Sequence, residues 1–407
     1  MSSSSPATPL VKGDHRLSKN INRMVVLRLL REQEGLSRAE LADRSGLTRS
    51  TVSLLVKELI AEGWLREDDV PVTGQLGRRP TPLQLDGHRF VLVGAELTPD
   101  MIRVVATSIQ GVVLAFDTAP LQQADPESAS DQLAAMVSAL IRRAVGQGQE
   151  VLGIGVGLPG SVEPSTAVLR LAPGMGWRDV PIGRHLRERF DAAGLSDVPV
   201  HCQNEADLAA IGQTEFGMRP PADPLVHVSC GIDVGAGVVI AGRLFIGATG
   251  AGGQIGHSTL QQQGRPCPCG RRGCAQAYIG LRAIAADAGL GWPLDRNALD
   301  AALAGRDPRA IAAMQSAGKH LGVVLQNIWA AIDPRAIVVG GESVALGGDD
   351  FVDAALRTLA DYAAAAGVPA PPVMPARHAE LAVAVGGAAY TLHLLMQPYQ
   401  GLLQHQR

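Results

Sequence analysis

The sequence has few aromatic residues, few cysteines, little net charge and no long hydrophobic run. Tryptophan, tyrosine and phenylalanine together make up 3% of its 407 residues, so the core must be built mainly from Ala, Val, Leu and Ile. No segment approaches the roughly 18 apolar residues that a membrane-spanning helix needs. The five cysteines are an odd number, and three of them crowd together, which favours metal binding over disulfides in a reducing compartment.

The remaining composition is that of a globular protein. Hydrophobic residues make up 46% of the chain and charged residues 18%, which argues against disorder. The 47 glycines and 26 prolines indicate many tight turns, as α/β folds require, and the length suits two or three domains. Residues 1–17 begin with a Ser/Pro-rich stretch that lacks the features of a signal peptide, so we expect a disordered tail and a cytoplasmic protein.

The formal net charge of −3 hides an uneven distribution. Residues 12–57 carry a local charge of +5, and the rest of the chain sums to −8. A basic segment beside an acidic body is typical of a protein whose head binds nucleic acid. Ordinary surface patchiness is the alternative that charge alone leaves open.

Residues 18–86 have the pattern of a winged helix-turn-helix. We expect a first helix over 20–31, a second that opens with a capping box and covers 37–44, and a third that begins after the N-cap Thr48. Two short strands at 64–67 and 82–85 would enclose the wing. The third helix has apolar residues at helical spacing, which form its core face: Val52, Leu55, Val56, Leu59 and Ile60.

The other face of the third helix carries short hydroxyl side chains and one arginine. These residue types suit phosphates and base edges in a major groove. We expect DNA contacts from this face, from the capping residues and from the wing tip, at Ser37, Thr48, Arg49, Ser50, Thr51, Ser53, Arg78 and Arg79. An ordinary three-helix subdomain is the alternative, but the wing and the basic charge together favour DNA binding.

From residue 88 onward, apolar strands alternate with amphipathic helices. We expect strands over 90–97, 102–109, 112–118 and 151–158, a helix over 128–145, and further strands over 225–229, 236–241 and 336–339. This alternation predicts an α/β body with a largely parallel, doubly wound layout. We expect one lobe over 88–202, with a C-terminal helix within 385–407 packing back on it, a second lobe over 203–384, and a cleft between them.

Four residues of metal-ligand type lie close together in the second lobe: His257, Cys267, Cys269 and Cys274. One imidazole and three thiolates form the complete ligand set of a structural, tetrahedral Zn²⁺. Three free thiols beside a core histidine are the alternative, but four such residues rarely fall this close by accident.

These motifs together resemble the ROK family of repressors, open reading frames and sugar kinases, in particular its winged-helix repressors. The resemblance runs from about residue 18 to 396 and rests on the zinc knuckle and on the motifs at 77–80, 155–160, 171–177 and 204–207. It implies a winged helix-turn-helix followed by a two-lobed, actin-like (ribonuclease H-like) sugar kinase fold. It also implies a sugar or sugar derivative as effector, a double-stranded DNA operator, and a homodimer or homotetramer.

The phosphate-binding turns of ROK kinases are altered in this chain. The first corresponds to residues 94–100, which lack the paired glycines of the kinases. The second, at 230–237, includes Asp233, whose charge would repel a triphosphate. This second turn keeps three glycines and the Gly-Gly pair at 340–341 survives, but the changes in the first two turns lead us to expect no catalytic residues and no enzyme activity.

The resemblance also implies a sugar site whose residues have changed. The catalytic aspartate of the kinases corresponds to Glu205, and the other implied ligand positions are Gly174, Asn204, Gln254, His257 and Gln276. His257 is expected either to contact the sugar while it binds zinc, or to serve zinc alone. With these positions changed, the effector need not be a plain hexose.

Three functions follow from these motifs. The favoured one is a sugar-responsive regulator of carbohydrate genes, a repressor in preference to an activator. The second is a sugar kinase with an accessory DNA-binding head, because a carboxylate remains at Glu205. The third is a constitutive DNA-binding protein whose pocket has lost its ligand.

Overall fold

The computed structural model describes residues 15–68, 81–163, 165–217 and 220–397 of the chain. These residues form two compact units. The first comprises the residues up to Arg89 together with those from His393 on, and the second runs from Phe90 to Leu392. None of the helices in the described ranges is long and apolar enough to cross a membrane.

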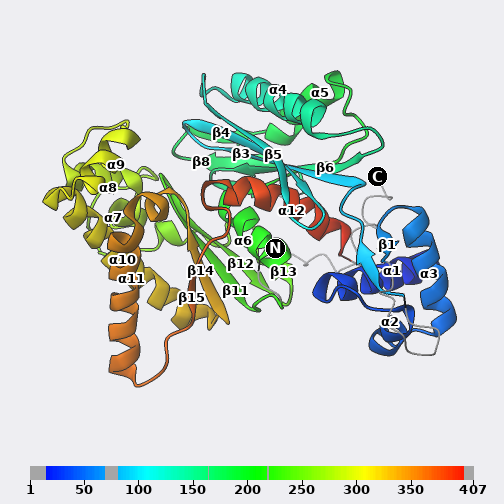
Figure 1. Ribbon diagram of the computed structural model, residues 1–407. Helices are drawn as coiled ribbons and strands as arrows, with labels where there is room; N and C mark the ends of the chain where they lie inside the picture. The colour runs from blue at the N-terminus through cyan, green and yellow to red at the C-terminus, as the bar shows by residue number, and fades with distance from the viewer. Residues whose placement is uncertain (1–14, 69–80, 164, 218–219, 398–407) are drawn as a thin grey trace, which may run out of the picture. The chain divides into compact units, whose positions relative to one another are not determined.

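The first unit is a helix-turn-helix followed by two antiparallel strands. Its elements, labelled in Figure 1, are α1 (His15–Glu32), α2 (Arg38–Ser45), α3 (Arg49–Ala61), β1 (Leu65–Glu67) and β2 (Leu83–Leu85). This order confirms the three helices and two strands expected from the sequence, with the first helix beginning at His15 rather than at Asn20.

The two turns around α2 carry the residues that their geometry requires. Ser37 and Glu40 form the predicted capping box at the start of α2, and the side chain of Thr48 accepts a hydrogen bond from the backbone of Thr51 at the start of α3. Gly46 ends α2 with a φ of 70°, a left-handed value that glycine adopts without strain. The exit from α2 and the entry into α3 are therefore set by local sequence.

The core of the first unit is the apolar face of α3. Val52, Leu55, Val56 and Leu59 are buried as predicted, while Ile60 is partly exposed. Buried leucines from the other elements complete this core: Leu27, Leu30, Leu41, Leu65 and Leu83. Burying several large aliphatic side chains at about 1.5–3 kcal/mol each is what holds three short helices together.

The second unit contains two five-stranded mixed sheets. The first has the order β10-β6-β3-β4-β5, with bounds β3 (Phe90–Leu97), β4 (Met101–Ser108), β5 (Val113–Pro120), β6 (Glu150–Leu158) and β10 (Val200–Asn204). Strands β10, β6 and β3 are parallel, but β3, β4 and β5 pair antiparallel. The prediction of a largely parallel layout was wrong for the pairings of β4 and β5, because connections of three or four residues cannot form a parallel crossover.

Helices cover both faces of this first sheet (Figure 1). The side chains of Val91, Val93 and Ala95 on β3 face a core shared with α4 (Pro126–Ala144) and α5 (Ile182–Ala192). The alternate residue Gly94 faces α12 (Ala382–Leu395), and a Cβ there would lie 1.7 Å from the carbonyl oxygen of Ala384. The glycines of β3 and β6 therefore let a helix lie directly on the sheet.

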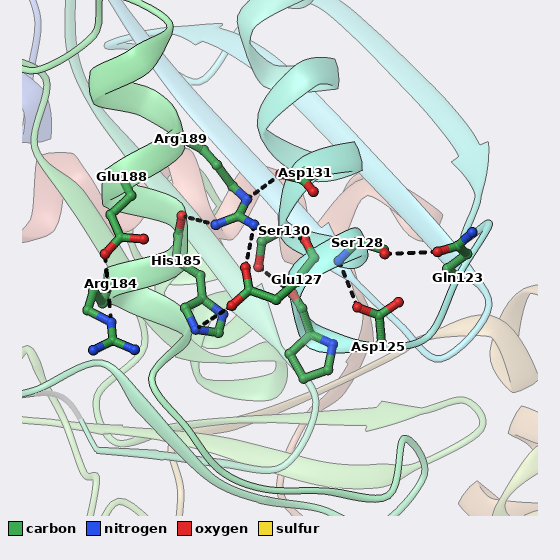
Figure 2. A network of polar contacts seen from close by, with 11 residues as sticks. Gln123, Asp125, Glu127, Ser128, Ser130, Asp131, Arg184, His185, Glu188 and Arg189 are labelled. Atoms are coloured by element: carbon green, nitrogen blue, oxygen red, sulfur yellow. Dashed lines mark hydrogen bonds and ion pairs between the residues drawn. The ribbon is translucent and has the colours of Figure 1, made fainter.

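A polar network joins α4 to α5 on the outer surface of this lobe (Figure 2). The Nε of Arg189 donates to Asp131 over 2.6 Å, and its guanidinium also pairs with Glu127. His185 Nε2 lies 3.1 Å from the same Glu127 carboxylate. These contacts fix the two helices against each other beyond their shared apolar core.

The small sheet and the second large sheet complete the body. The small sheet is β7 (Ser161–Glu163), β8 (Val168–Ala172) and β9 (Trp177–Val180). The second large sheet has the order β13-β12-β11-β14-β15, with bounds β11 (Leu225–Cys230), β12 (Val234–Ile240), β13 (Arg243–Leu244), β14 (Ala336–Gly340) and β15 (Val373–Pro375). It too is mixed: β11 is antiparallel to β12 and parallel to β14.

Two layers of helices enclose the second sheet. On one face, α6 (Glu205–Phe216) packs closely over Gly237, where a Cβ would lie 2.2 Å from the carbonyl oxygen of Ala206. The opposite face shares an apolar core with α7 (Gln276–Ile279), α8 (Leu281–Ala288), α9 (Arg296–Ala304), α10 (Pro308–Ile332) and α11 (Glu342–Ala366). Two 3-10 turns, η1 (Ile255–His257) and η2 (Ala379–Leu381), precede the three clustered cysteines and α12, respectively.

Candidate functional site

One face of α3 is polar and exposed, with an apolar residue at its centre. Ser50, Ser53, Leu54 and Lys57 share this face because they follow helical spacing, and all four are exposed. Leu54 is 57% exposed, so this polar face presents one large aliphatic side chain to solvent. Arg49 stands exposed in the first turn and forms no ion pair with any residue that the structure describes.

The predicted DNA contacts fall into three groups. Ser37 is buried and its hydroxyl lies 2.7 Å from the Glu40 carboxylate, so its side chain serves the capping box. The Thr48 hydroxyl caps α3 and lies 2.8 Å from that of Thr51. The third group is Arg49, Ser50 and Ser53, which are exposed; the Ser50 hydroxyl also lies 2.9 Å from that of Thr48.

The wing-tip arginines Arg78 and Arg79 lie outside the described residues. Leu54 lies on the same exposed face but is not among the predicted DNA contacts, all of which are polar side chains. The spacing of the core face could have found it, since Leu54 is the one leucine of the helix that this spacing leaves out.

The four predicted metal ligands converge in the second lobe. The ligand atoms of His257, Cys267, Cys269 and Cys274 all lie within 4.8 Å of one another. His257 ends the turn η1, and the cysteines are held by a short antiparallel turn that pairs Thr259 with Cys274. This is the one group of three or more such ligands among the residues that the structure describes.

The geometry of the cluster fits a tetrahedral zinc ion. Zn–S bonds of about 2.3 Å place two thiolates about 3.8 Å apart along a tetrahedron edge. The sulfurs of Cys269 and Cys274 are 3.8 Å apart, and Cys267 Sγ lies 3.8 Å from His257 Nδ1. Gly273, with φ of 77°, lets the turn close, because a Cβ there would lie 1.7 Å from the carbonyl oxygen of Gln261.

A small cavity lined by carboxylates lies beside β3, β11 and the start of α6. We call it the acidic cavity. Its volume is about 80 Å³, and its charged and polar lining includes Glu96, Asp100, Arg103, Glu205, His227, Asp233, Glu342 and Glu380. Two arginines pair with part of this charge. Arg103 lies 3.2 Å from Glu96, and Arg296 lies 2.6 Å from Asp100 and also pairs with Glu342.

Burial changes the protonation of the carboxylates in the acidic cavity. Desolvation raises the pKa of Glu96 to about 7, although the nearby Arg103 opposes the shift. The pKa of Glu205 is raised well above its usual range, first by burial and then by the negative charges of Asp233 and Glu96. Negative charge is therefore costly here, and further negative charge from a triphosphate would add to that cost.

A second cavity of about 340 Å³ lies against the turn that carries the three cysteines; we call it the knuckle cavity. Its lining includes Gly174, Ile232, Asp233, Arg265, Gln276, Arg282 and Asp287. Gln276 Nε2 donates to Asp233 Oδ1 over 2.5 Å. A Cβ at Gly174 would lie 3.3 Å from Asp233 Oδ2, so the absence of a side chain at 174 leaves room for that carboxylate. Ile232 and Asp233 line both cavities.

The structure brings together only part of the predicted sugar site. Gly174 and Gln276 line the knuckle cavity, and Glu205 lines the acidic cavity. Asn204 instead caps α6 and donates from Nδ2 to the carbonyl of Gly160 over 2.7 Å. His257 and Gln254 bound the turn η1 and line neither cavity. Binding of a ligand by each of these residues stays a prediction.

Asp233 is the central residue that sequence reasoning placed differently. We interpreted it as a charge that repels phosphate. The structure makes it the residue shared by both cavities, in contact with Gln276. Its signal in the sequence was an acidic side chain inside a glycine-rich turn, but only the fold shows that Gly174 lies opposite it.

The fold and these sites define a helix-turn-helix protein with a body of the sugar kinase type. The ROK family matches residues 101–393, and the IclR helix-turn-helix domain matches residues 24–69. The chain belongs to the ROK family, as its motifs predicted.

The chain is similar to both regulators and kinases of this family. It is 28% identical to the xylose repressor of Caldicellulosiruptor bescii over 348 residues, which cover 81% of this chain and 85% of that one. A ROK family transcriptional regulator, a homolog of the Escherichia coli MLC protein, superimposes with a TM-score of 0.75 at 20% identity, covering 96% of this chain and 98% of that one. A ROK family glucokinase from Streptomyces griseus, solved with glucose and AMPPNP, has a TM-score of 0.64 at 24% identity, covering 74% and 98%.

Proposed function

We propose that this chain is a DNA-binding transcriptional repressor of carbohydrate genes whose body binds a sugar or sugar derivative. The observation that carries the proposal is the exposed polar face of α3, presented by a complete helix-turn-helix on a ROK body. The similarity to a xylose repressor over most of both chains supports it.

The helix-turn-helix supplies the DNA-binding chemistry. α3 enters the major groove with its N-terminal turn first, so Arg49 and Ser50 reach base edges or phosphates. Two heads of a homodimer, or of a homotetramer acting in pairs, bind half-sites about one helical turn apart. Effector binding in the body changes the preferred spacing of the heads and with it the operator affinity.

The effector site in this proposal is the knuckle cavity. Its volume of about 340 Å³ falls within the range of roughly 300–1,000 Å³ typical of small-molecule sites. Gln276, two residues after the ligand Cys274, offers an amide to ligand hydroxyls, and Asp233 offers a carboxylate. The metal cluster thus shapes one wall of this cavity.

The metal in this proposal is a structural Zn²⁺ held by the His-Cys₃ cluster. When bound, zinc supplies a tetrahedral cross-link without redox chemistry. The residues of the chain position it through η1 and the turn at 259–274. Elemental analysis of the purified protein tests this assignment.

A selection from genomic DNA tests the proposed function. The purified full chain is mixed with sheared genomic DNA at moderate salt, and the bound fragments are sequenced. We expect a small set of sites to be enriched, with two-fold related half-sites. Uniform recovery of fragments would show that the protein has no operator.

A ROK-type sugar kinase with an accessory DNA-binding head is the alternative function. One observation favours it: Glu205, which corresponds to the catalytic aspartate of the kinases, lines the acidic cavity. The charge of the acidic cavity, which would repel a nucleotide triphosphate, supports the regulator instead. Coupled assays of ATP turnover over a sugar panel distinguish the two, and sugar-dependent ADP release would establish the kinase.

Leu54 is expected to contact a thymine methyl group in the operator. The thymine methyl group is the apolar feature of the major groove, and an exposed aliphatic side chain on the proposed DNA-facing side of α3 can pack against it. Replacing that thymine by uracil removes only the methyl group, and we expect about fourfold weaker binding, the equivalent of about 0.8 kcal/mol. The measurement is fluorescence anisotropy with operators carrying single uracil substitutions.

The matched variant for this test is Leu54→Ala. It should bind the thymine and uracil operators equally, because the side chain that senses the methyl group is gone. A uracil effect that persists in this variant, or that is absent from the unaltered protein at every thymine, would contradict the assignment.

A further inference from the structure

Three acidic side chains that line the acidic cavity lack a cationic partner among the described residues: Glu205, Asp233 and the exposed Glu380. Of the arginines nearby, Arg103 pairs with Glu96, and Arg296 pairs with Asp100 and Glu342. Glu205 and Asp233 form no ion pair with any residue in the part of the chain that the structure describes. A pair of carboxylates held out of bulk water without a cation is destabilising unless a ligand or protons compensate.

Arg282 is not the missing cationic partner of Asp233. It lines the knuckle cavity, and its charge favours the ionised form of Asp233. Its guanidinium lies over the ring of Trp292, 4.8 Å from the centroid, and makes no ion pair with that aspartate. Gln276 gives Asp233 one neutral hydrogen bond, which leaves the second carboxylate oxygen for another donor.

A buried histidine in the lining of the same cavity has a ring nitrogen without a hydrogen-bond partner among the described residues. His227 lines the acidic cavity with 1% of its surface exposed, and its Nδ1 has no hydrogen-bond partner among the described residues. Burial lowers its pKa to about 4, so the ring is neutral at physiological pH. A neutral imidazole can accept a hydrogen bond, and buried polar atoms of this kind are normally satisfied.

The chemistry of this lining selects among ligands. A phosphate or carboxylate group would meet six acidic side chains and is disfavoured. A resident metal is disfavoured because, among the described residues, the carboxylates and imidazole here do not form a group of ligands that could hold an ion; the His-Cys₃ cluster alone does. A protonated amine satisfies two carboxylates and a neutral imidazole with the three N–H donors it carries.

The two cavities together fit a ring that carries a small cationic group. The acidic cavity, at about 80 Å³, has room for little more than such a group, while the knuckle cavity is about 340 Å³. Asp233 and Ile232 line both, so a ligand can extend from one into the other. A larger residue at Gly174 would crowd Asp233 from the opposite side.

We propose that the effector of this protein is an amino sugar with a free, protonated amine that binds between Glu205 and Asp233. The sugar ring occupies the knuckle cavity against Gln276, and His227 completes the polar lining around the amine. This inference rests on the proposed role of the body as an effector-binding domain. It makes Asp233 the residue that determines specificity for a cationic ligand.

Isothermal titration of the full chain with matched sugars tests the proposal. The probes are D-glucosamine, D-glucose and N-acetyl-D-glucosamine, with the corresponding galactose and mannose sets, at a pH where the amines are protonated. We expect at least one free amino sugar to bind about tenfold or more tightly than both its parent sugar and its N-acetyl form, as a charge-assisted contact predicts. Asp233→Asn and Glu205→Gln should each remove most of this preference.

The control variant is Asp361→Asn, which removes an exposed carboxylate on α11, away from both cavities. It should keep the full preference for the amine. Equal or tighter binding of the parent or N-acetylated sugars would overturn the proposal, and so would the failure of every amino sugar to bind. Heat of binding from Mn²⁺ or Mg²⁺ alone that is lost in Asp233→Asn would also overturn it, in favour of a metal site.

These outcomes are separate from the test of the proposed function. Enrichment of operator fragments from genomic DNA does not depend on which sugar binds. A protein that selects an operator but shows no preference for amines refutes only the ligand class. A protein that selects no operator refutes the regulator itself.

Discussion

Cys269→Ser is expected to abolish stoichiometric zinc binding and to lower the free energy of unfolding by on the order of 4 kcal/mol. The reason is that the turn carrying the cysteines has little apolar core of its own. Cys267 and Cys274 are buried, and their sulfurs lie within 4.8 Å of the other ligand atoms. Without the ion, the cross-link between η1 and this turn is lost.

The measurements are elemental analysis and thermal unfolding of both proteins side by side. The unaltered chain should contain one zinc per chain. Cys230→Ala is the matched control, because this buried thiol of β11 lies outside the cluster and its loss should leave the zinc content unchanged. A native protein without metal, or a Cys269→Ser protein that keeps its zinc, would contradict the assignment.

Arg49→Ala is expected to weaken operator binding by roughly tenfold to a hundredfold without changing the melting temperature. A bidentate arginine contact to a guanine contributes about 1–3 kcal/mol of discrimination, and a phosphate contact contributes to general affinity. Arg49 is exposed on the first turn of α3 and takes part in no ion pair of the described residues, so its removal leaves the fold intact.

Fluorescence anisotropy with operator and non-operator fragments at several salt concentrations measures this effect. Arg142→Ala, on the exposed side of α4 in the other unit, makes the same change in net charge and serves as the control. The prediction fails if the two variants bind the operator equally well. A loss confined to the operator fragment indicates a base contact, and a uniform loss with a smaller salt slope indicates a phosphate contact.

Local sequence predicted the helix-turn-helix well. Capping residues and glycine turns act over a few residues. Ser37 and Thr48 therefore predicted the starts of α2 and α3, and Gly46 predicted the end of α2. The strand directions of the body were harder to predict, because alternation of strands and helices does not distinguish a parallel sheet from a mixed one. The connections between β3, β4 and β5 are too short for a parallel crossover, so these strands must pair antiparallel. In the sequence, only the small number of residues between the strands indicates this.

The candidate sites differ in the same way. The metal cluster was predictable because its four ligands fall within a short segment and have one shared chemistry. The residue pair Gly174 and Asp233 was not, since the two positions lie far apart in sequence and meet only in the folded second unit. The motif predicts Asn204 as a ligand residue, which stays a prediction, but only the structure shows that its side chain also caps the N-terminus of α6.

The most direct test of the account is the affinity of the selected operator fragment with and without a saturating sugar. The ligand is the sugar that binds in the titration panel, and the readout is fluorescence anisotropy of the labelled fragment. The account predicts that the sugar changes operator affinity by about 5- to 150-fold, and that the operator changes sugar affinity by the same factor. Identical operator affinity at saturating sugar would contradict the claim that this body regulates this DNA-binding head.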